Sequence, residues 1–298
     1  MALADLATGQ DLAYYALEHG SQSQSTQDDY YDVVKAAIQK NYWEILSLEP
    51  WKFALNPTPG AFATEASQAV TVSSVSTNQM TLSATIATSQ AGKKVYLDAL
   101  QTVYRIDAHT AGTNILSLDA TWVETLTSGP ATIYQDEYAL VTSAMLVWGP
   151  LLLRGNAEHE IELIGDREFT AKYNNGDWGT SGPPEYARQI ANSTLGQLQV
   201  QIAPAHSVEH VIEYQYTKFR SLDFTGAGSG DTPVLPLASR WVIAERALWD
   251  LLRVKNNDLA GAAWNRAEDH LTLMRTRYLG NASRPKSWVR FRNNLGAG

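Results

Sequence analysis

The chain has 298 residues, a formal net charge of −8 and 18% charged residues, which is fewer than the roughly 25% of an average soluble protein. The acidic balance argues against broad binding to nucleic acid or to an anionic membrane, because both require surplus Lys and Arg. The absence of cysteine excludes a disulfide framework and thiolate catalysis. A chain of this length can bury a full core as one large domain or two.

Hydropathy predicts no membrane-spanning helix. The first residues lack a basic segment followed by an apolar run, so no signal peptide is predicted. The longest apolar patch, 144–153, is interrupted by Gly149 and Pro150 and falls short of the about 18 residues that a membrane helix needs. The expected setting is a cytosol-like or particle environment without membrane contact.

The first 50 residues predict an arm followed by a helix. Residues 1–25 combine a weakly helical stretch with a polar linker that begins at Gly20, so we expect a tethered arm. From Gln27 to Leu48 apolar residues recur at helical spacing, Thr26 can cap the helix, and Pro50 ends it. This helix is expected to pack into a core.

Residues 57–153 change to Val, Thr, Ser and Ala in period-two alternation. Short strands are predicted at 69–75, 79–87, 92–97, 102–108, 114–119 and 131–134. Turn residues separate them at intervals of roughly 8–12 residues, which is typical of a small antiparallel barrel or sandwich. This β domain stands as an insertion between helical segments.

The segment after the insertion predicts a mixture of elements. A short strand is expected at 161–164, a helical turn at 166–173 and a long loop over 174–184. The alternating runs 198–202 and 208–219 flank Pro204 and predict a β-hairpin.

Residues 236–279 predict two helices joined by a short polar turn, with an apolar face on each. We expect these faces to form the core of a helical domain that needs partners to cover it. The residues assigned to this core are Leu237, Trp241, Leu248, Leu251, Leu271 and Tyr278.

Together these elements predict an α+β fold. A helical bundle, made of the N-terminal helix and the C-terminal helical hairpin, carries an inserted antiparallel β-barrel or sandwich and a further β-hairpin. The expected parts are the arm at 1–25, the helical domain at 26–56 and 154–281, the β insertion at 57–153, and a tail at 282–298.

No arrangement of catalytic residues emerges, so we expect neither an enzyme nor a cofactor or metal site. His206 and His210 lie four apart on a predicted strand, a spacing that does not converge on one metal ion. The glycine-rich run 226–231 lacks the Lys and the strand–loop–helix context of a phosphate loop. Trp178 and the Tyr-rich strands leave a carbohydrate-binding module as an alternative.

The tail interleaves basic and aromatic residues and carries no acid. One interpretation is a disordered tail. The other is a docking peptide with aromatic anchors and arginines that pair with acids on a partner, while nucleic-acid binding is secondary. The proposed docking residues are Arg284, Lys286, Trp288, Arg290, Phe291 and Arg292.

The β insertion carries a succession of motifs in the runs 92–95, 103–107, 112–119 and 133–140. Their order resembles that of tailed-bacteriophage head-to-tail connector proteins, the adaptors of the tail tubular protein A type. Later segments extend the resemblance, so that it covers about 27 to 280: 182–186, 198–204, 213–216 and 231–236. Val141 stands where the family commonly has Pro, and the N-terminal arm has no counterpart.

The resemblance implies a structural protein of the virion neck, made in the host cytoplasm. Such adaptors form rings, expected to be dodecamers, that join the portal protein to a nozzle, stopper or other tail protein. Genomic double-stranded DNA passes through their lumen during ejection. The helical domain would form the ring and the tail would dock on the portal. A stopper or tail-completion protein of the same neck, or a glycan-binding tail module, are the alternatives.

Overall fold

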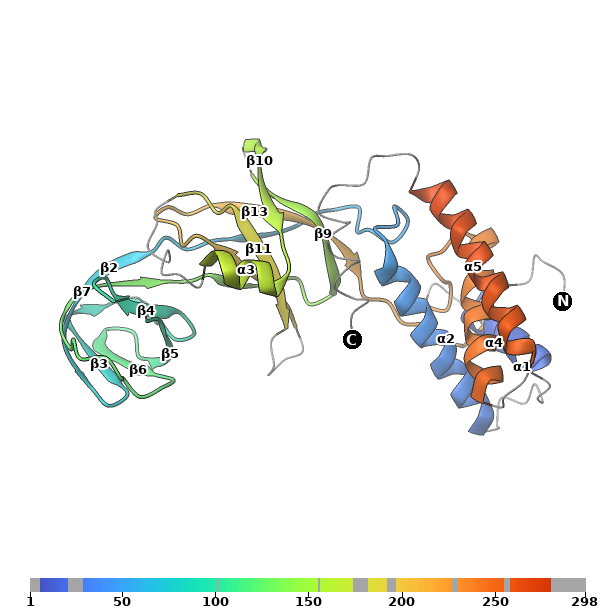
Figure 1. Cartoon of the computed structure of the whole chain (residues 1–298), viewed down its shortest axis with the longest axis horizontal. Coiled ribbons are helices and arrows are strands. Elements are labelled where there is room, and N and C mark those ends of the chain that lie inside the picture. The colour runs from blue at the N-terminus through green and yellow to red at the C-terminus, as the bar shows by residue number, and fades with distance from the viewer. Residues whose placement is uncertain are drawn as a thin grey trace. The chain divides into compact units, whose positions relative to one another are not determined.

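The structure is a computed structural model of the whole chain. It describes residues 6–20, 29–100, 102–154, 156–173, 182–191, 197–226, 230–254 and 258–279. The chain divides into two compact units (Figure 1). The helical unit comprises 1–57, 143–146 and 216–283, and the β unit includes 58–142 and 147–215.

The predicted fold class is wrong, because strands rather than helices dominate. The described residues form thirteen strands and five α-helices. Six strands close a barrel and the other seven form a single sheet. The sequence predicted the barrel but not the sheet, since half of the sheet's strand pairs join segments far apart in the chain.

The barrel confirms all six strands predicted within the insertion. Its strand order is β2-β3-β6-β5-β4-β7. The strands are β2 (Gln68–Ser76), β3 (Gln79–Ile86), β4 (Lys94–Leu97), β5 (Tyr104–His109), β6 (Thr113–Leu118) and β7 (Gly129–Tyr134). Alternate residues such as Met80, Ile106, Leu116 and Ile133 point inward and are buried, as the period-two pattern requires.

The seven-stranded sheet has the order β1-β13-β9-β10-β11-β12-β8. Its strands are β1 (Gly60–Ala63), β8 (Glu137–Ala139), β9 (Ala144–Leu153), β10 (Asn156–Leu163), β11 (Tyr186–Ala191), β12 (Leu198–Ala203) and β13 (Val211–Lys218). The predicted hairpin of β12 with β13 is wrong: β12 pairs with β11 and β8, whereas β13 pairs with β1. Between β10 and β11 the chain forms α3 (Asp166–Tyr173), the predicted helical turn, which packs on β11.

The helical unit is organised around α4 (Trp241–Val254), which packs against α1 (Gly9–His19), α2 (Asp29–Leu48) and α5 (Leu259–Tyr278). The two predicted C-terminal helices are therefore confirmed. The first starts later than expected, because Pro236 precedes a 3₁₀ turn, η2 (Leu237–Ser239), instead of entering the helix. No helix in the described ranges is long and apolar enough to cross a membrane.

The segment from Leu6 to Gly20 belongs to the helical core. Thr8 and Asp11 form a reciprocal capping box that starts α1, and Leu12 and Leu17 are fully buried. The Arg240 guanidinium also donates hydrogen bonds to the carbonyl oxygens of Leu6 and Ala7. The sequence grouped these residues with a tethered arm, whereas the structure uses them to cover α4.

Candidate functional site

The six residues assigned to the ring core mostly stabilise a single copy of the chain. Leu248, Leu251 and Leu271 are buried, and α1 and α2 supply the cover that the predicted apolar faces needed. Trp241 and Tyr278 are partly buried and make edge-on ring contacts, with Tyr15 (4.9 Å between centroids) and Phe53 (5.3 Å) respectively. Leu237 is the exception among the six, with 45% of its surface exposed.

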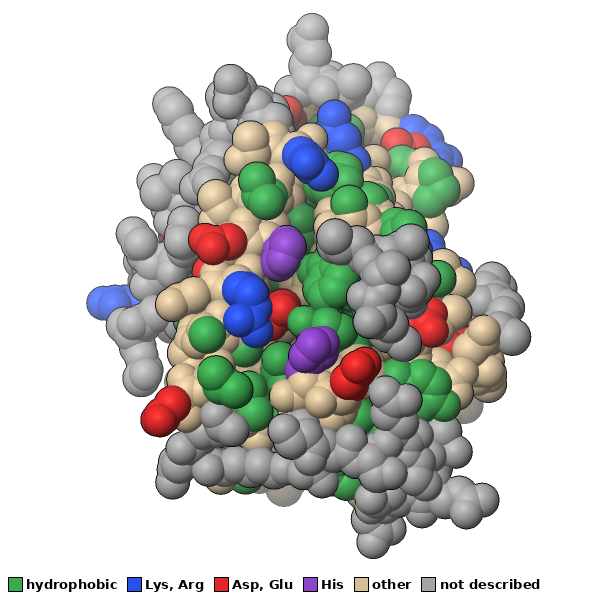
Figure 2. Space-filling model, turned by 90° about the vertical axis from the view of Figure 1, so that its right-hand side faces the viewer, with side chains coloured by type: hydrophobic (Ala, Val, Ile, Leu, Met, Phe, Trp, Pro, Cys, Tyr) green, Lys and Arg blue, Asp and Glu red, His purple; other side chains and the backbone are tan. Residues whose placement is uncertain are grey.

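Exposed apolar side chains remain on the helical unit. Leu273 on α5 is 54% exposed and Val33 on α2 is 53% exposed, while Leu237 lies in η2, which packs against α5. Figure 2 faces this unit and shows hydrophobic side chains gathered among charged and histidine side chains. Exposed apolar side chains of this kind can be covered by a partner protein.

A buried ionic network joins three helices of the same unit. Glu245 on α4 is 2% exposed. The Arg266 guanidinium binds both its carboxylate oxygens, at 3.0 and 2.9 Å, and the Tyr15 hydroxyl donates to Oε1 at 2.9 Å. Burial, followed by the charge of Glu245, raises the pKa of Tyr15. Since each polar group is satisfied by a neighbour, the network fixes α1, α4 and α5 together.

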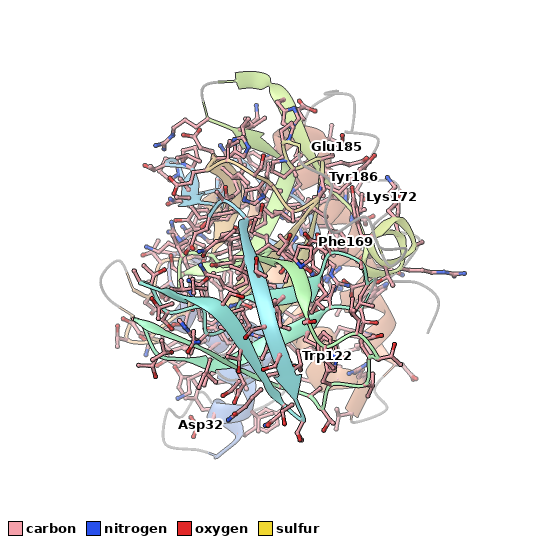
Figure 3. All side chains as sticks on the ribbon, turned by 90° about the vertical axis from the view of Figure 1, so that its left-hand side faces the viewer. Asp32, Trp122, Phe169, Lys172, Glu185 and Tyr186 are labelled. Carbon is pink, nitrogen blue, oxygen red and sulfur yellow. The ribbon has the colours of Figure 1, made fainter. Side chains whose placement is uncertain are left out.

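The β unit contains a cavity of about 220 Å³, here called the α3 pocket. Phe169, Thr170 and Tyr173 line it from one side of α3, and Figure 3 labels Phe169 beside Lys172 and Tyr186. The remaining lining residues come from the barrel and the sheet: Lys94, Val103, Tyr134, Arg188 and Gln201.

Asp136 contacts two residues that line the α3 pocket and is 2% exposed. It accepts hydrogen bonds from Lys94 Nζ at 2.8 Å and from the Gln201 amide. Burial raises the pKa of Asp136, and the charge of Lys94 opposes that rise. Lys94 also pairs with Glu137 at 2.9 Å, so two carboxylates already offset its charge.

Arg188 supplies the accessible positive charge of the α3 pocket. Its Nε donates to Gln201 Oε1 at 2.7 Å, and its guanidinium lies 4.9 Å from the centre of the Phe169 ring. Its Nη1 also forms an ion pair with the largely exposed Asp166 carboxylate at 3.5 Å. No Asp or Glu is among the lining residues that the structure describes. The α3 pocket therefore offers the remaining N–H groups of Arg188 to an acidic group, beside a wall of buried aromatic rings.

The histidines that the sequence singled out lie close together but form no metal centre. The rings of His206 and His210 are 5.7 Å apart, and His206 is 1% exposed. Burial, followed by the neighbouring His210, lowers the pKa of His206 to about 4. Within the described residues no group of three His, Cys, Asp or Glu side chains could hold a metal ion.

Other predicted sites contribute structure or lie outside the described residues. Asp231 is fully buried and accepts N–H groups from Gln10, Phe224 and Gly226, so it organises the backbone around it. Tyr214 and Tyr216 of β13 are buried and present no open face to a sugar. Trp178 and all six proposed docking residues of the tail lie outside the described residues.

Sequence reasoning missed the α3 pocket. Its local signal is the spacing of Phe169 and Tyr173, four apart on one side of a short helix. Lys94, Arg188 and Gln201 come from separate strands that only the tertiary structure brings together. The chain matches no protein-family model, and no curated protein sequence matches it significantly.

Proposed function

We propose that the chain is a structural, non-catalytic adaptor in the neck of a tailed bacteriophage. Copies of it would form a ring, a dodecamer by the family resemblance, that joins the portal protein to the tail around the path of double-stranded DNA. One observation carries the proposal: the β unit is inserted between helical segments that come together in one core. That organisation agrees with the succession of connector-like motifs in the sequence.

The surface of the helical unit supports assembly. Its core is covered within one chain, yet Leu237 in η2, Leu273 on α5 and Val33 on α2 are exposed. Exposed apolar side chains on different elements of one protomer allow head-to-tail contacts, which close into a ring when the rotation between copies permits. We infer that such contacts form the ring wall.

The oligomeric state tests this proposal. Native mass spectrometry and negative-stain electron microscopy of the purified chain, alone and mixed with portal rings, are expected to detect closed rings. A chain that stays monomeric under both conditions would contradict the adaptor role. Electron microscopy of the phage neck would separate an adaptor, adjacent to the portal, from a stopper or tail-completion protein further down.

The tail can be tested separately. Deleting residues 283–298, or combining Trp288→Ala with Arg290→Ala, is expected to weaken portal binding without unfolding either unit. Portal binding would be measured by co-sedimentation, with circular dichroism as the control for folding. Unchanged portal binding by the truncated chain would rule out the tail as the docking segment and leave the ring proposal standing.

A further inference from the structure

We propose that neighbouring copies of this chain also contact each other through their β units. The tip of the barrel loop (residues 119–128, between β6 and β7) of one copy would enter the α3 pocket of the next. The tip consists of Val123, Glu124, Thr125 and Leu126. This inference rests on the proposed function, in which copies of the chain assemble into a ring. It adds one specific contact between neighbouring copies.

The barrel loop is fixed in place before it meets a partner. The Trp122 ring stacks on Tyr104 with 4.5 Å between ring centres. The Trp122 backbone N–H donates to the Thr77 carbonyl at 2.6 Å, and the Val123 N–H donates to the Tyr104 hydroxyl at 3.1 Å. The Trp122 indole N–H then binds the Leu126 carbonyl at 3.2 Å. A fixed loop loses little conformational entropy on binding.

This fixed loop presents apolar side chains to solvent. Val123 is 77% exposed and Leu126 is 38% exposed. Glu124 lies between them in the chain and is partly exposed. The tip therefore combines a carboxylate with two aliphatic side chains, a combination suited to a site that offers both a cation and apolar walls.

The α3 pocket has the complementary chemistry. Arg188 can direct its remaining N–H groups at a carboxylate, while the buried rings of Phe169 and Tyr173, 1% and 7% exposed, form part of the apolar wall of the pocket. Arginine and aromatic residues are also the types that dominate binding energy at protein interfaces. The volume of about 220 Å³ is smaller than the roughly 300–1,000 Å³ of small-molecule sites. It suits one or two inserted side chains better than a cofactor.

Charge favours the barrel loop over the tail as the occupant. Residues 282–298 carry four basic residues and no acid, so Arg188 would repel them. The labelled Trp122 and Phe169 lie apart in Figure 3, although Val103, which lines the α3 pocket, directly precedes Tyr104, on which Trp122 stacks. A contact between two different surfaces is head-to-tail and repeats around a ring.

Disulfide trapping between two single-cysteine variants tests the contact directly, because the natural chain has no cysteine. Val123→Cys places a thiol on the loop tip and Thr170→Cys places one on an exposed position of the α3 pocket. The two variants are dissociated, mixed, reassembled and oxidised with copper phenanthroline. A disulfide-linked pair containing one copy of each variant is expected.

Ser83→Cys, on an exposed position of β3, serves as the matched control in place of Val123→Cys. If the loop and control variants link equally well to Thr170→Cys, the inference is overturned. Tryptic peptides would be identified by mass spectrometry, so that links between copies of the same variant are counted separately.

A charge swap gives an independent measurement. In the proposed contact, Glu124→Arg would place a second cation beside Arg188 of the next copy, and Thr170→Glu would place a second carboxylate beside Glu124. Each substitution is expected to weaken assembly about tenfold through like-charge repulsion. The double variant is expected to regain most of the loss, as measured by sedimentation velocity. Both positions are at least partly exposed, so the substitutions spare the core. A double variant no better than either single one would contradict the pairing.

The outcomes separate this contact from the proposed function. Closed rings without a link between positions 123 and 170 would overturn the contact and leave the adaptor proposal intact. Linked open chains without closed rings would support the contact and contradict the ring. A monomeric chain that gives no link would overturn both.

Discussion

Gly60 lies directly against the ring of Tyr214, its partner across β1 and β13. A Cβ added to Gly60 would be 2.3 Å from Tyr214 Cζ. Tyr214 is 2% exposed and its hydroxyl accepts the Val141 N–H at 3.0 Å, so the ring has little room to move. We therefore expect Gly60→Ala to lower the free energy of unfolding by about 1–3 kcal/mol, measured by urea denaturation.

Gly261 provides the control for that substitution. It lies in α5, is exposed, and a Cβ there would meet nothing within 4 Å. Because alanine favours a helix more than glycine, Gly261→Ala should raise the free energy of unfolding by up to about 1 kcal/mol. If both substitutions had the same sign, steric contact with Tyr214 would not be the cause of the first effect.

The Glu245–Arg266 pair predicts a second stability effect. Arg266→Ala would leave a carboxylate that is 2% exposed without its cation. Removing one partner of a buried pair costs about 3–5 kcal/mol. The Arg266 side chain is 51% exposed, so water can partly replace it, and we expect a loss of about 1–3 kcal/mol in urea denaturation.

Neutralising Glu245 should reverse part of that loss. In the double variant Glu245→Gln with Arg266→Ala, the amide can still accept the Tyr15 hydroxyl bond and no buried charge remains. The double variant should therefore be more stable than Arg266→Ala alone. Equal stability of the two would show that the packing of the Arg266 stem, not its charge, carries the effect.

Buried His206 and partly buried His210 predict that the folded chain is less stable in acid. His206 has its pKa lowered from 6.5 to about 4, and burial also lowers the pKa of His210. The unfolded chain therefore binds protons more readily than the folded chain. The stabilisation that these neutral histidines contribute is fully present above pH 6.5 and is lost as the pH falls from about 6.5 towards 4. One such histidine contributes a slope of at most about 1.4 kcal/mol per pH unit.

Replacing His206 tests the assignment. His206→Gln removes one titrating group while keeping a polar side chain beside Tyr138, whose hydroxyl lies 3.4 Å from His206 Nε2. Urea denaturation between pH 7 and pH 4.5 should give a flatter stability profile for this variant than for the natural chain. Parallel profiles would assign the acid sensitivity to other groups.

Local pattern was sufficient to predict the barrel strands but not the seven-stranded sheet. The barrel strands alternate in part and turns between them fall at residues with positive φ, such as Thr77 and Gly112, so each strand could be delimited from its own sequence. β1 lies beside a Pro-rich segment that reads as a breaker, yet it pairs with β13 far along the chain. Periodicity identifies a strand's faces, and only the tertiary structure determines its neighbours.

The same limit applies to the candidate sites. The apolar faces of α4 and α5 and their cover by α2 were predictable from helical spacing, but their cover by α1 was not, because Leu12 and Leu17 lie in a segment whose sequence is only weakly helical. The α3 pocket depends on Arg188 and Lys94, which are unremarkable charged residues in separate strands. Tertiary contact gives them a shared role that composition and spacing do not encode.

Two adjacent residues of α5 allow folding and assembly to be tested separately. Leu273 is 54% exposed, whereas Met274 is 1% exposed and packs in the helical core. Leu273→Glu should leave the free energy of unfolding within about 0.5 kcal/mol of the natural value but reduce the fraction of rings in native mass spectrometry. Met274→Glu buries a charge in the core and should destabilise by more than about 3 kcal/mol. If Leu273→Glu assembled as well as the natural chain, this face of α5 would be excluded from the ring contact.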